Sequence, residues 1–347
     1  MQDLLDKAQG TQCSDIHLIT GRPPLFRVLG ELRPINYEVL TLEAMRGYMA
    51  LIMSEIQRMQ FNDGNDVDTA YADQHGNRYR INVYRQQGVP CIAIRLLRNR
   101  IPTLEELHMP PILARLAEAP RGLILVTGPT GSGKSTTLAA MINHINKTRY
   151  HHILTLEDPL EYLHKSDKSL INQREIHRDV NDFASGLRSA LREDPDVILV
   201  GEMRDHETIS LALTAAETGH LVFSTLHTLG AAPTIDRIID VFPPHQQSQI
   251  RTQLASSLNA VISQALIPMR DRSGRIAVQE IMVMTDAIGN LIRENKIVQI
   301  NTAIQTGLKL DMTTMELSLA KLVNSGTITL ESATDIAPNK ELLNRYL

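Results

Sequence analysis

The chain has 347 residues, of which 43% are apolar and 21% are charged, and its formal net charge is −4 at pH 7. A chain of this length can form two domains with separate cores, and its nearly balanced charge argues against a protein whose main partner is nucleic acid. Its two cysteines, Cys13 and Cys91, lie far apart, which argues against both a disulfide framework and a cysteine-based zinc site.

The N-terminal part of the chain predicts a small mixed α/β unit. It begins without a basic leader or an apolar core, and no apolar run approaches the ~20 residues of a membrane span, so we expect a cytoplasmic protein. A helix is expected from Thr41 until Asn62, because apolar residues recur there at helical spacing. The expected extended runs, of which the last three read as an antiparallel meander, are 15–19, 25–32 (broken at Gly30), 66–72, 77–84 and 89–97.

A change of pattern after a predicted linker at 99–105 marks a second domain. Residues Thr103 to Glu106 have capping-box spacing for a new helix. From Gly122 onward, short apolar strands alternate with helices, which predicts a parallel sheet covered on both faces. The expected strands are 123–127, 153–156, 197–200 and 221–226, and the expected helices are 135–147, 182–193, 206–218 and 231–241.

The rest of the chain is expected to be mostly helical. A long amphipathic segment, 245–266, leads to a strand near 276–284, and helices follow to the end. We therefore expect an N-terminal domain at 1–98, a core at 106–284 and a C-terminal helical region at 285–347.

A glycine-rich segment between the first strand and the first helix of the core matches the phosphate-loop pattern G-x-x-x-x-G-K-[S/T] in full. It consists of Gly128, Pro129, Thr130, Gly131, Ser132, Gly133, Lys134, Ser135 and Thr136. Its glycines lack the Cβ atoms that would keep a polyphosphate away from backbone N–H groups. We expect Lys134 to reach the outer phosphates and the Ser135 hydroxyl to bind Mg²⁺. Because a strand precedes the loop and a helix follows it, a glycine turn that binds nothing is the weaker interpretation.

Polar residues also follow three other predicted strands, at the sheet edge where α/β proteins bind their ligands. Glu157 and Asp158 are candidates for organising the magnesium shell or the attacking water. Glu202 is a candidate for orienting or deprotonating that water. The side chains expected to bind Mg²⁺ are Ser135, Asp158 and Glu202. His227 is a candidate sensor of the terminal phosphate. The alternative for Glu157 and Asp158 is a turn with Asp before Pro. The alternative for Glu202 is an exposed loop glutamate, and that for His227 is a structural histidine.

Four motifs together resemble the signature set of the secretion ATPase superfamily. They are Gly128–Thr136, Leu156–Pro159, Asp194–Asp205 and Ala215–His220. Within the superfamily the chain is similar to the type IV pilus retraction ATPases, also called twitching-motility proteins, from Ser14 to the terminal helices. The resemblance implies an α/β protein in which a PAS-like α+β domain precedes a RecA-like P-loop ATPase core with C-terminal helices.

The resemblance also implies an activity and an assembly. The expected protein is a Mg²⁺-dependent ATPase that forms a homo-hexameric ring and powers pilus retraction. Its expected partners are a platform protein of the inner membrane and a related accessory ATPase, and these partners would place it at the cytoplasmic face of that membrane. No nucleic-acid partner is expected.

Site residues follow from the resemblance position by position. Glu202 matches the catalytic glutamate of the family, and His227 lies in its His box. Glu157 and Asp158 match the family's Asp box. The strands that carry Arg80 and Arg95 match those whose arginines approach the outer phosphates of the nucleotide in the family. The alternative for this pair is an exposed polar face of the meander.

The chain departs from the retraction family at Gly289, where members typically carry an arginine in a motif that spans 287–294 here. The motif is implied to serve retraction in cells but not ATP hydrolysis, and a glycine disfavours a helix. The alternative is that Leu291 and Ile292 pack the helix while residue 289 faces solvent.

Three other functions remain open. A pilus-assembly or type II secretion ATPase would share the core, but this resemblance associates it with a longer N-terminal region and a four-cysteine zinc insertion, which two distant cysteines cannot supply. A nucleic-acid translocase with a RecA-like core would be expected to carry a basic stripe. An accessory ring that binds nucleotide without turnover is disfavoured by Lys134, Ser135 and Glu202.

Overall fold

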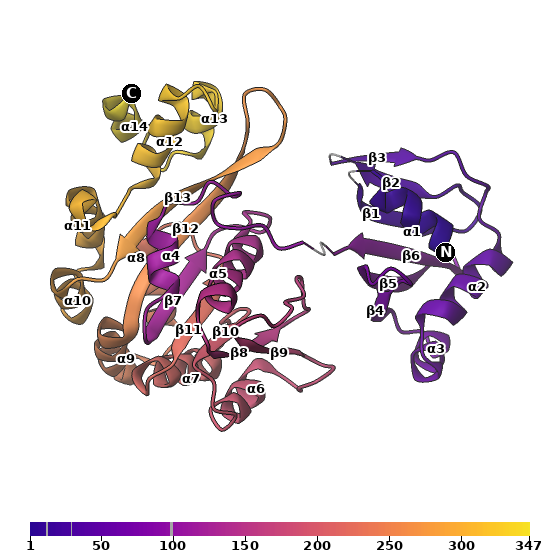
Figure 1. The fold of residues 1–347 in the computed structure, drawn as a ribbon, viewed down its shortest axis with the longest axis horizontal. Helices are drawn as coiled ribbons and strands as arrows, with labels where there is room; N and C mark the ends of the chain where they lie inside the picture. The colour runs from indigo at the N-terminus through magenta and orange to yellow at the C-terminus, as the bar shows by residue number, and fades with distance from the viewer. Residues whose placement is uncertain (12, 29, 98–99) are drawn as a thin grey trace. The chain divides into compact units, whose positions relative to one another are not determined.

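The computed structural model describes all residues of the chain except 12, 29, 98 and 99. The chain forms two compact units, 1–100 and 101–347 (Figure 1). Residue 29 of the expected run 25–32, the end of the expected N-terminal domain at 98 and the start of the expected linker at 99 lie outside the described residues. No helix in the described part of the chain is long and apolar enough to cross a membrane.

The N-terminal unit is built on a six-stranded antiparallel sheet of order β3-β2-β1-β6-β5-β4. Strands β4, β5 and β6 pair consecutively, so the predicted meander is confirmed. Helices α1, α2 and α3 bury apolar side chains on one face of this sheet, which is the α+β arrangement expected of a PAS-like domain. The elements are α1 (Gln2–Gln9), β1 (Cys13–Ile19), β2 (Leu25–Val28), β3 (Glu31–Pro34), α2 (Leu42–Ile52), α3 (Glu55–Asn62), β4 (Val67–Ala72), β5 (Arg78–Gln86) and β6 (Val89–Leu96).

The single helix expected from Thr41 is two helices, α2 and α3. The break occurs at Ser54, whose hydroxyl accepts a hydrogen bond from the Gln57 backbone N–H while the Gln57 side chain accepts one from the Ser54 backbone N–H. This capping box starts a new helix. The prediction was wrong because apolar residues continue at helical spacing on both sides of the break.

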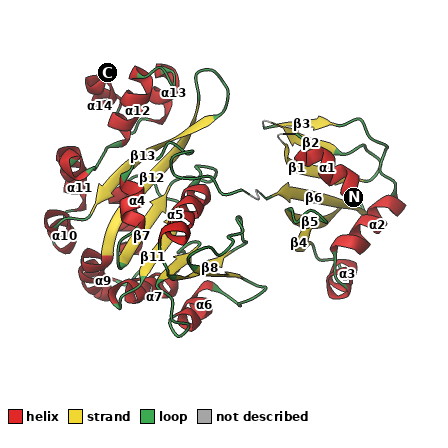
Figure 2. Cartoon of the chain, viewed as in Figure 1, coloured by secondary structure: helices red, strands yellow, loops and turns green. Residues whose placement is uncertain are grey.

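The second unit contains a seven-stranded sheet of order β13-β12-β7-β11-β10-β8-β9. Its strands are parallel except β13, which runs antiparallel to β12 (Figure 2). The elements up to the end of the sheet are α4 (Ile112–Ala117), β7 (Gly122–Thr127), α5 (Lys134–Thr148), β8 (His152–Glu157), β9 (Leu170–Glu175), α6 (Phe183–Ala190), β10 (Val197–Val200), α7 (His206–Glu217), β11 (Leu221–Leu226), α8 (Ala231–Asp240), α9 (Pro244–Ser257), β12 (Leu258–Pro268) and β13 (Arg275–Val283).

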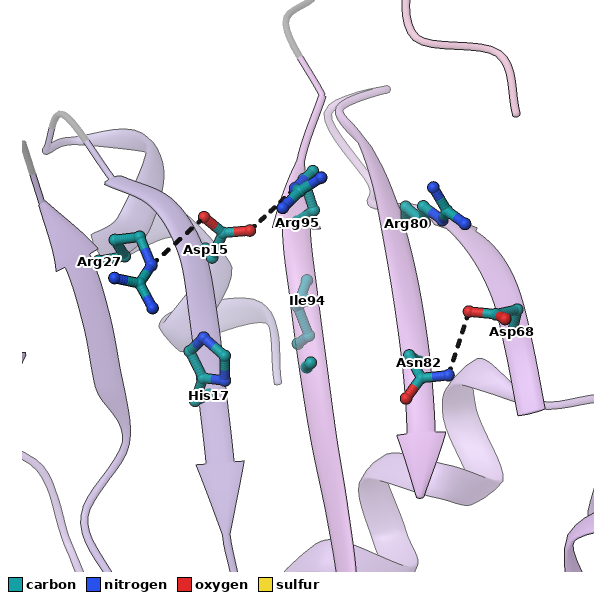
Figure 3. A pocket seen from close by; sticks show the side chains of 9 residues that line it. Asp15, His17, Arg27, Asp68, Arg80, Asn82, Ile94 and Arg95 are labelled. Atoms are coloured by element: carbon teal, nitrogen blue, oxygen red, sulfur yellow. Dashed lines mark hydrogen bonds and ion pairs between the residues drawn. The ribbon is translucent and has the colours of Figure 1, made fainter. Parts of the chain in front are cut away.

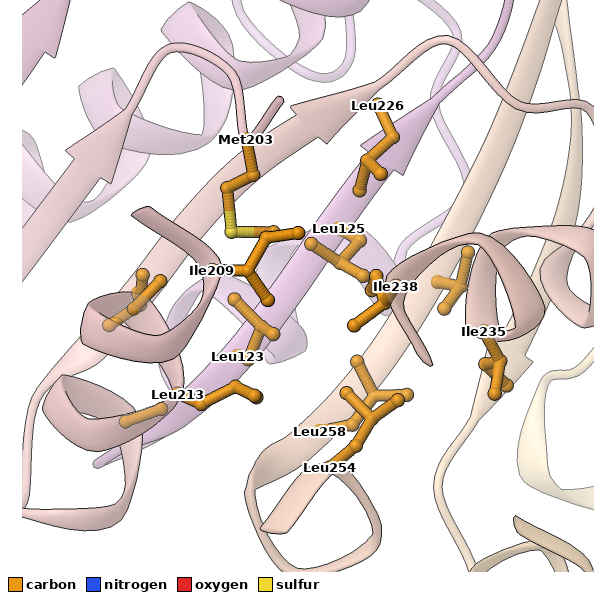
Figure 4. Packing of buried hydrophobic residues seen from close by; sticks show 14 of the residues in the cluster. Leu123, Leu125, Met203, Ile209, Leu213, Leu226, Ile235, Ile238, Leu254 and Leu258 are labelled. Atoms are coloured by element: carbon orange, nitrogen blue, oxygen red, sulfur yellow. The ribbon is translucent and has the colours of Figure 1, made fainter. Parts of the chain in front are cut away.

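Both faces of this sheet are covered, as the alternation of strands and helices predicted. On strand β7, Ile124 and Val126 pack with α4 and α5. The intervening Leu123 and Leu125 pack with α7, α8 and α9, and Figure 4 shows them among the side chains of this second core. Burial on both faces explains why these strands are continuous apolar runs.

Two expectations about local structure were wrong. The segment 245–266 is not one amphipathic element, because α9 ends at Ser257 and β12 begins at Leu258. Strand β12 lies between β7 and β13 and is buried over most of its length, so it lacks the alternating pattern of a half-buried strand.

The capping box at Thr103 and Glu106 does form, but only turns follow it. Pro110 and Pro111 then precede α4, and proline interrupts a helix that has already begun.

The predicted helical C-terminal region is present. Its helices are α10 (Asp286–Arg293), α11 (Ile300–Thr306), α12 (Met315–Asn324), α13 (Leu330–Ile336) and α14 (Lys340–Tyr346). The alternative that residue 289 faces solvent was wrong, because Gly289 is buried. A Cβ atom at this position would lie 3.6 Å from the Ala255 carbonyl oxygen of α9, so residue 289 lies where α10 packs against α9.

Candidate functional site

The phosphate loop connects β7 to α5 at the carboxyl edge of the parallel sheet. Gly128, Gly131 and Gly133 have φ values of +141°, +78° and +88°, which favour glycine. A Cβ atom at Gly128 would also clash with the backbone oxygen of Gln264. The loop therefore has the tight, glycine-dependent shape that brings backbone N–H groups close to phosphates.

Gln264, on the neighbouring strand β12, holds the loop in this shape. Its side-chain Nε2 donates a 2.7 Å hydrogen bond to the Ser132 carbonyl oxygen, and its Oε1 accepts a 2.8 Å bond from the Thr137 hydroxyl. Only 1% of Gln264 is exposed. Sequence reasoning missed this residue, although a glutamine inside a long apolar run was a signal for it, since buried polar side chains are hydrogen-bonded.

Lys134 is the buried cation of the site. Its ammonium group donates hydrogen bonds to the carbonyl oxygens of Gly128, at 2.9 Å, and Pro129, at 3.1 Å. Burial lowers the pKa of Lys134, and the negative charges of Glu161 and Glu202 act in the opposite direction. Two carboxylates, one in the loop after β8 and one in the loop after β10, therefore act on this ammonium group. Sequence reasoning assigned a role to Glu202 but missed Glu161.

Glu202 and His227 lie side by side, because they follow β10 and β11, which are parallel neighbours. The His227 Nε2 lies 3.6 Å from one carboxylate oxygen of Glu202, and the Arg204 Nε lies 2.7 Å from the other. The Glu202 side chain is 16% exposed, whereas the side chains of His227 and Arg204 are half exposed or more. The Glu202 carboxylate is therefore semi-buried, with the Arg204 guanidinium beside one oxygen and the His227 ring beside the other.

The other two acidic candidates differ from each other. The Glu157 carboxylate accepts hydrogen bonds from the Thr155 hydroxyl, at 2.8 Å, and from Gln173 Nε2 of β9, at 3.3 Å. Burial, the main cause, raises the pKa of Glu157 to about 7. Asp158 is exposed at the start of the following loop. Glu157 is thus bound to side chains of β8 and β9, and Asp158 is accessible to a ligand.

Arg80 and Arg95 belong to the N-terminal unit, where they are partners on adjacent strands. They line a cavity of about 330 Å³ on the face of the sheet opposite to the helices (Figure 3). The Arg95 Nε lies 2.9 Å from an Asp15 carboxylate oxygen, whereas Arg80 has no carboxylate partner in the described part of the chain. Both arginines are exposed. The structure brings this pair together within unit 1–100.

A larger cavity, of about 810 Å³, extends from Pro129–Ser132 of the phosphate loop to helices α11, α12 and α14. Two carboxylates in its wall, a half-buried one and a buried one, accept hydrogen bonds from backbone N–H groups at the starts of helices. Glu280 accepts a 2.8 Å hydrogen bond from the Ala231 backbone N–H at the start of α8, and burial raises its pKa. Glu316 accepts a 3.0 Å bond from the Asn339 backbone N–H before α14. The C-terminal helices therefore contribute to the surroundings of the phosphate loop.

These residues fit a nucleoside triphosphate with Mg²⁺. The loop supplies the narrow cradle and Lys134 the cation, and Ser135, Asp158 and Glu202 supply oxygen atoms at the same sheet edge. Among the described residues, no group of three or more His, Cys, Asp or Glu side chains is arranged to hold a metal ion. The side-chain oxygens of Ser135, Asp158 and Glu202 suit Mg²⁺, because this ion takes few protein ligands and keeps phosphate and water oxygens.

Comparisons with known proteins match nearly the whole chain. A family model described as type II/IV secretion system protein matches residues 2–334. The type IV pilus retraction ATPase PilT of Pseudomonas aeruginosa is 51% identical over 324 residues, which cover 93% of this chain and 94% of that protein. A twitching motility protein of Neisseria gonorrhoeae is 52% identical over 321 residues, or 92% of this chain and 86% of that protein. A crystal structure of the pilus retraction motor PilT with bound ADP matches with a TM-score of 0.93 and 44% identity, covering 99% of both chains.

Proposed function

Because the chain belongs to the type II/IV secretion system protein family, we propose that it is an ATP-hydrolysing motor that powers type IV pilus retraction. The observation that carries the proposal is the convergence of Glu202 and the buried Lys134 at a glycine cradle, in a chain that matches retraction ATPases over nearly its full length. The match to a motor with bound ADP supports an adenine nucleotide as the ligand.

In the proposed reaction, different groups of the site bind the phosphates and activate the attacking water. The loop N–H groups and Lys134 bind the phosphates and neutralise the charge that spreads over the transferred group. Glu202 orients or deprotonates the attacking water, and Arg204 and His227 hold its two oxygens. Ser135, Asp158 and Glu202 are the candidate side chains that would hold Mg²⁺, which when bound would neutralise part of the phosphate charge. Glu157 remains a proposed organiser of the magnesium shell or of the attacking water, and His227 a proposed phosphate sensor.

The proposed assembly is a homo-hexameric ring. In that ring, Arg80 and Arg95 would approach the outer phosphates, and their exposure on one face of unit 1–100 supports this role. Hydrolysis would then change the contacts between domains, and order-dependent opening and closing would supply motion. The proposed partners are a platform protein of the inner membrane and a related accessory ATPase, which would keep the ring at the cytoplasmic face of that membrane.

The test is Mg²⁺-dependent ATP turnover of the purified protein and of Glu202→Gln, with light scattering after size exclusion on the same samples. We expect turnover by a hexamer, and a loss of about 100-fold or more in Glu202→Gln with nucleotide binding retained, since a positioned base contributes that much. Glu341→Gln, which changes an exposed carboxylate of α14, is the matched control and should turn over like the wild type.

Two outcomes would count against the proposal. Unaltered turnover in Glu202→Gln would remove this residue from its role. Nucleotide binding without turnover in the wild type would favour the accessory ring, the second candidate. The glycine at position 289 keeps that candidate open, because it removes a guanidinium group from the motif implied to serve retraction.

A further inference from the structure

The loop 158–169, between β8 and β9, is joined to the phosphate loop by one pair of hydroxyl groups. The Tyr162 hydroxyl oxygen lies 2.9 Å from the Thr136 Oγ1. Thr136 follows Ser135 in the first turn of α5, and Tyr162 follows Glu161, one of the two carboxylates that act on Lys134. Tyr162 is 7% exposed, so this hydrogen bond is largely shielded from water.

The same loop is held from its other side by Gln173 of β9. Gln173 Nε2 donates a 2.9 Å hydrogen bond to the Tyr162 carbonyl oxygen, and its Oε1 accepts a 2.8 Å bond from the His164 backbone N–H. The Nε2 also lies 3.3 Å from the Glu157 Oε1. One side chain therefore fixes the backbone on both sides of residue 163 and contacts the acid at the end of β8.

A third attachment lies at the far end of α5. Asn146, which is 2% exposed, donates a 2.8 Å hydrogen bond from Nδ2 to the Lys165 carbonyl oxygen. Its Oδ1 accepts a 2.9 Å bond from the Asp167 backbone N–H. The loop is thus attached to both ends of the helix that begins with Lys134, which favours movement of helix and loop as one body.

We propose that the Tyr162 hydroxyl is a positioning group, which ties loop 158–169 to the phosphate loop so that Glu161 and Asp158 keep their place at the nucleotide. This inference rests on the proposed ATPase function. The hydroxyl touches neither Lys134 nor Glu202, so it acts through the loop. Without it, the aromatic ring remains buried while the acidic loop is released from Thr136, and transition-state positioning suffers more than ground-state binding.

The experiment is a double-mutant cycle of Tyr162→Phe and Thr136→Val. Each single change should lower kcat about five- to tenfold with little change in KM, the loss expected for one shielded hydrogen bond. The double variant should be no slower than the worse single variant, because both changes remove the same bond. In a Thr136→Ser background, which keeps a hydroxyl, Tyr162→Phe should again cost five- to tenfold. Tyr150→Phe is the matched control, since Tyr150 is 83% exposed and adjoins the end of α5.

A second readout separates this inference from the ATPase proposal. Amide hydrogen exchange of residues 158–169 is measured with and without ADP, which needs no turnover. ADP should slow exchange in this loop in the wild type but much less in Tyr162→Phe. A wild type without turnover would refute the proposed function, and exchange would still decide the coupling. Additive losses in the cycle, wild-type kcat in Tyr162→Phe, or an equal effect of ADP on both proteins would overturn the inference.

Discussion

His164 is a half-buried histidine whose surroundings lead us to expect that acid destabilises the folded protein. Its ring lies in the loop attached to Gln173, and its Nδ1 is buried without a hydrogen-bond partner among the described residues. Burial lowers the pKa of His164 to about 4, against about 6.5 for an unperturbed histidine. The unfolded chain therefore takes up this proton first as the pH falls. The stability due to the neutral ring is complete above about pH 6.5 and is lost progressively toward pH 4.

The corresponding prediction concerns His164→Leu. Replacing the imidazole should remove about 2 kcal/mol of the stability loss between pH 7.5 and pH 5, because a leucine takes up no proton. Urea unfolding at the two pH values measures the difference. His245→Gln changes an exposed histidine and should leave the pH dependence as in the wild type. Equal acid sensitivity of His164→Leu and the wild type would show that His164 is not the responsible group.

At the scale of one element, α10 carries a glycine in the middle of a helix of eight residues. A Cβ atom at Gly289 would meet its nearest neighbours, an Arg293 guanidinium nitrogen and the Ala255 carbonyl oxygen, at 3.5 and 3.6 Å. These are ordinary contact distances, so the space for a methyl group is present. The helix therefore carries the conformational cost of glycine without a local steric reason for it.

Gly289→Ala should raise the free energy of unfolding by about 0.5–1 kcal/mol, with ATP turnover unchanged. Thermal or denaturant unfolding measures the gain. Gly186→Ala in α6 is the contrasting variant, because its Cβ would lie 3.0 Å from a Leu156 methyl group under the sheet. That substitution should be neutral or destabilising. A loss of stability in Gly289→Ala would mean that α10 cannot accept the added atom.

At the scale of the whole molecule, the candidate chemistry is divided between two units. Lys134, Glu202 and the phosphate loop belong to unit 101–347, whereas Arg80 and Arg95 belong to unit 1–100. Arg95 is paired with Asp15, whereas Arg80 has no carboxylate partner in the described part of the chain. Arg80 is therefore the better candidate for meeting an external anion.

Arg80→Ala should lower ATP turnover about 10³-fold if its guanidinium stabilises the transferred phosphoryl group, while ADP binding to the second unit persists. Turnover and ADP titration of the full-length protein separate the two effects. Arg58→Ala, which removes an exposed arginine of α3, is the control. Wild-type turnover in Arg80→Ala would favour the alternative, in which Arg80 and Arg95 belong only to an exposed polar face of the sheet.

The sequence predicted those parts of the molecule that local chemistry determines. The phosphate loop follows from the spacing of its glycines, and the alternation of strands and helices around it follows from the apolar pattern. The positions of Glu202 and His227 beyond the ends of β10 and β11 follow from the polar residues after two apolar runs. Gln264 and Tyr162 could not be assigned in this way, because their hydrogen-bond partners lie on elements distant in the chain. The separate helix α3 and the strand β12 were missed because apolar spacing alone does not distinguish a restarted helix or a doubly buried strand.

Strand β12 links the phosphate loop mechanically to the C-terminal helices. Gln264, which clamps the loop, lies in the middle of the strand, and Ala265 and Ile267 farther along pack into the core formed by α12, α13 and α14. Sliding β12 by one residue would turn Gln264 to the opposite face of the sheet and release the clamp completely. We therefore expect β12 to keep its register and to move, if at all, as a rigid strand. A movement of the C-terminal helices is therefore expected to reach the phosphate loop only when β12 moves with them as a rigid strand.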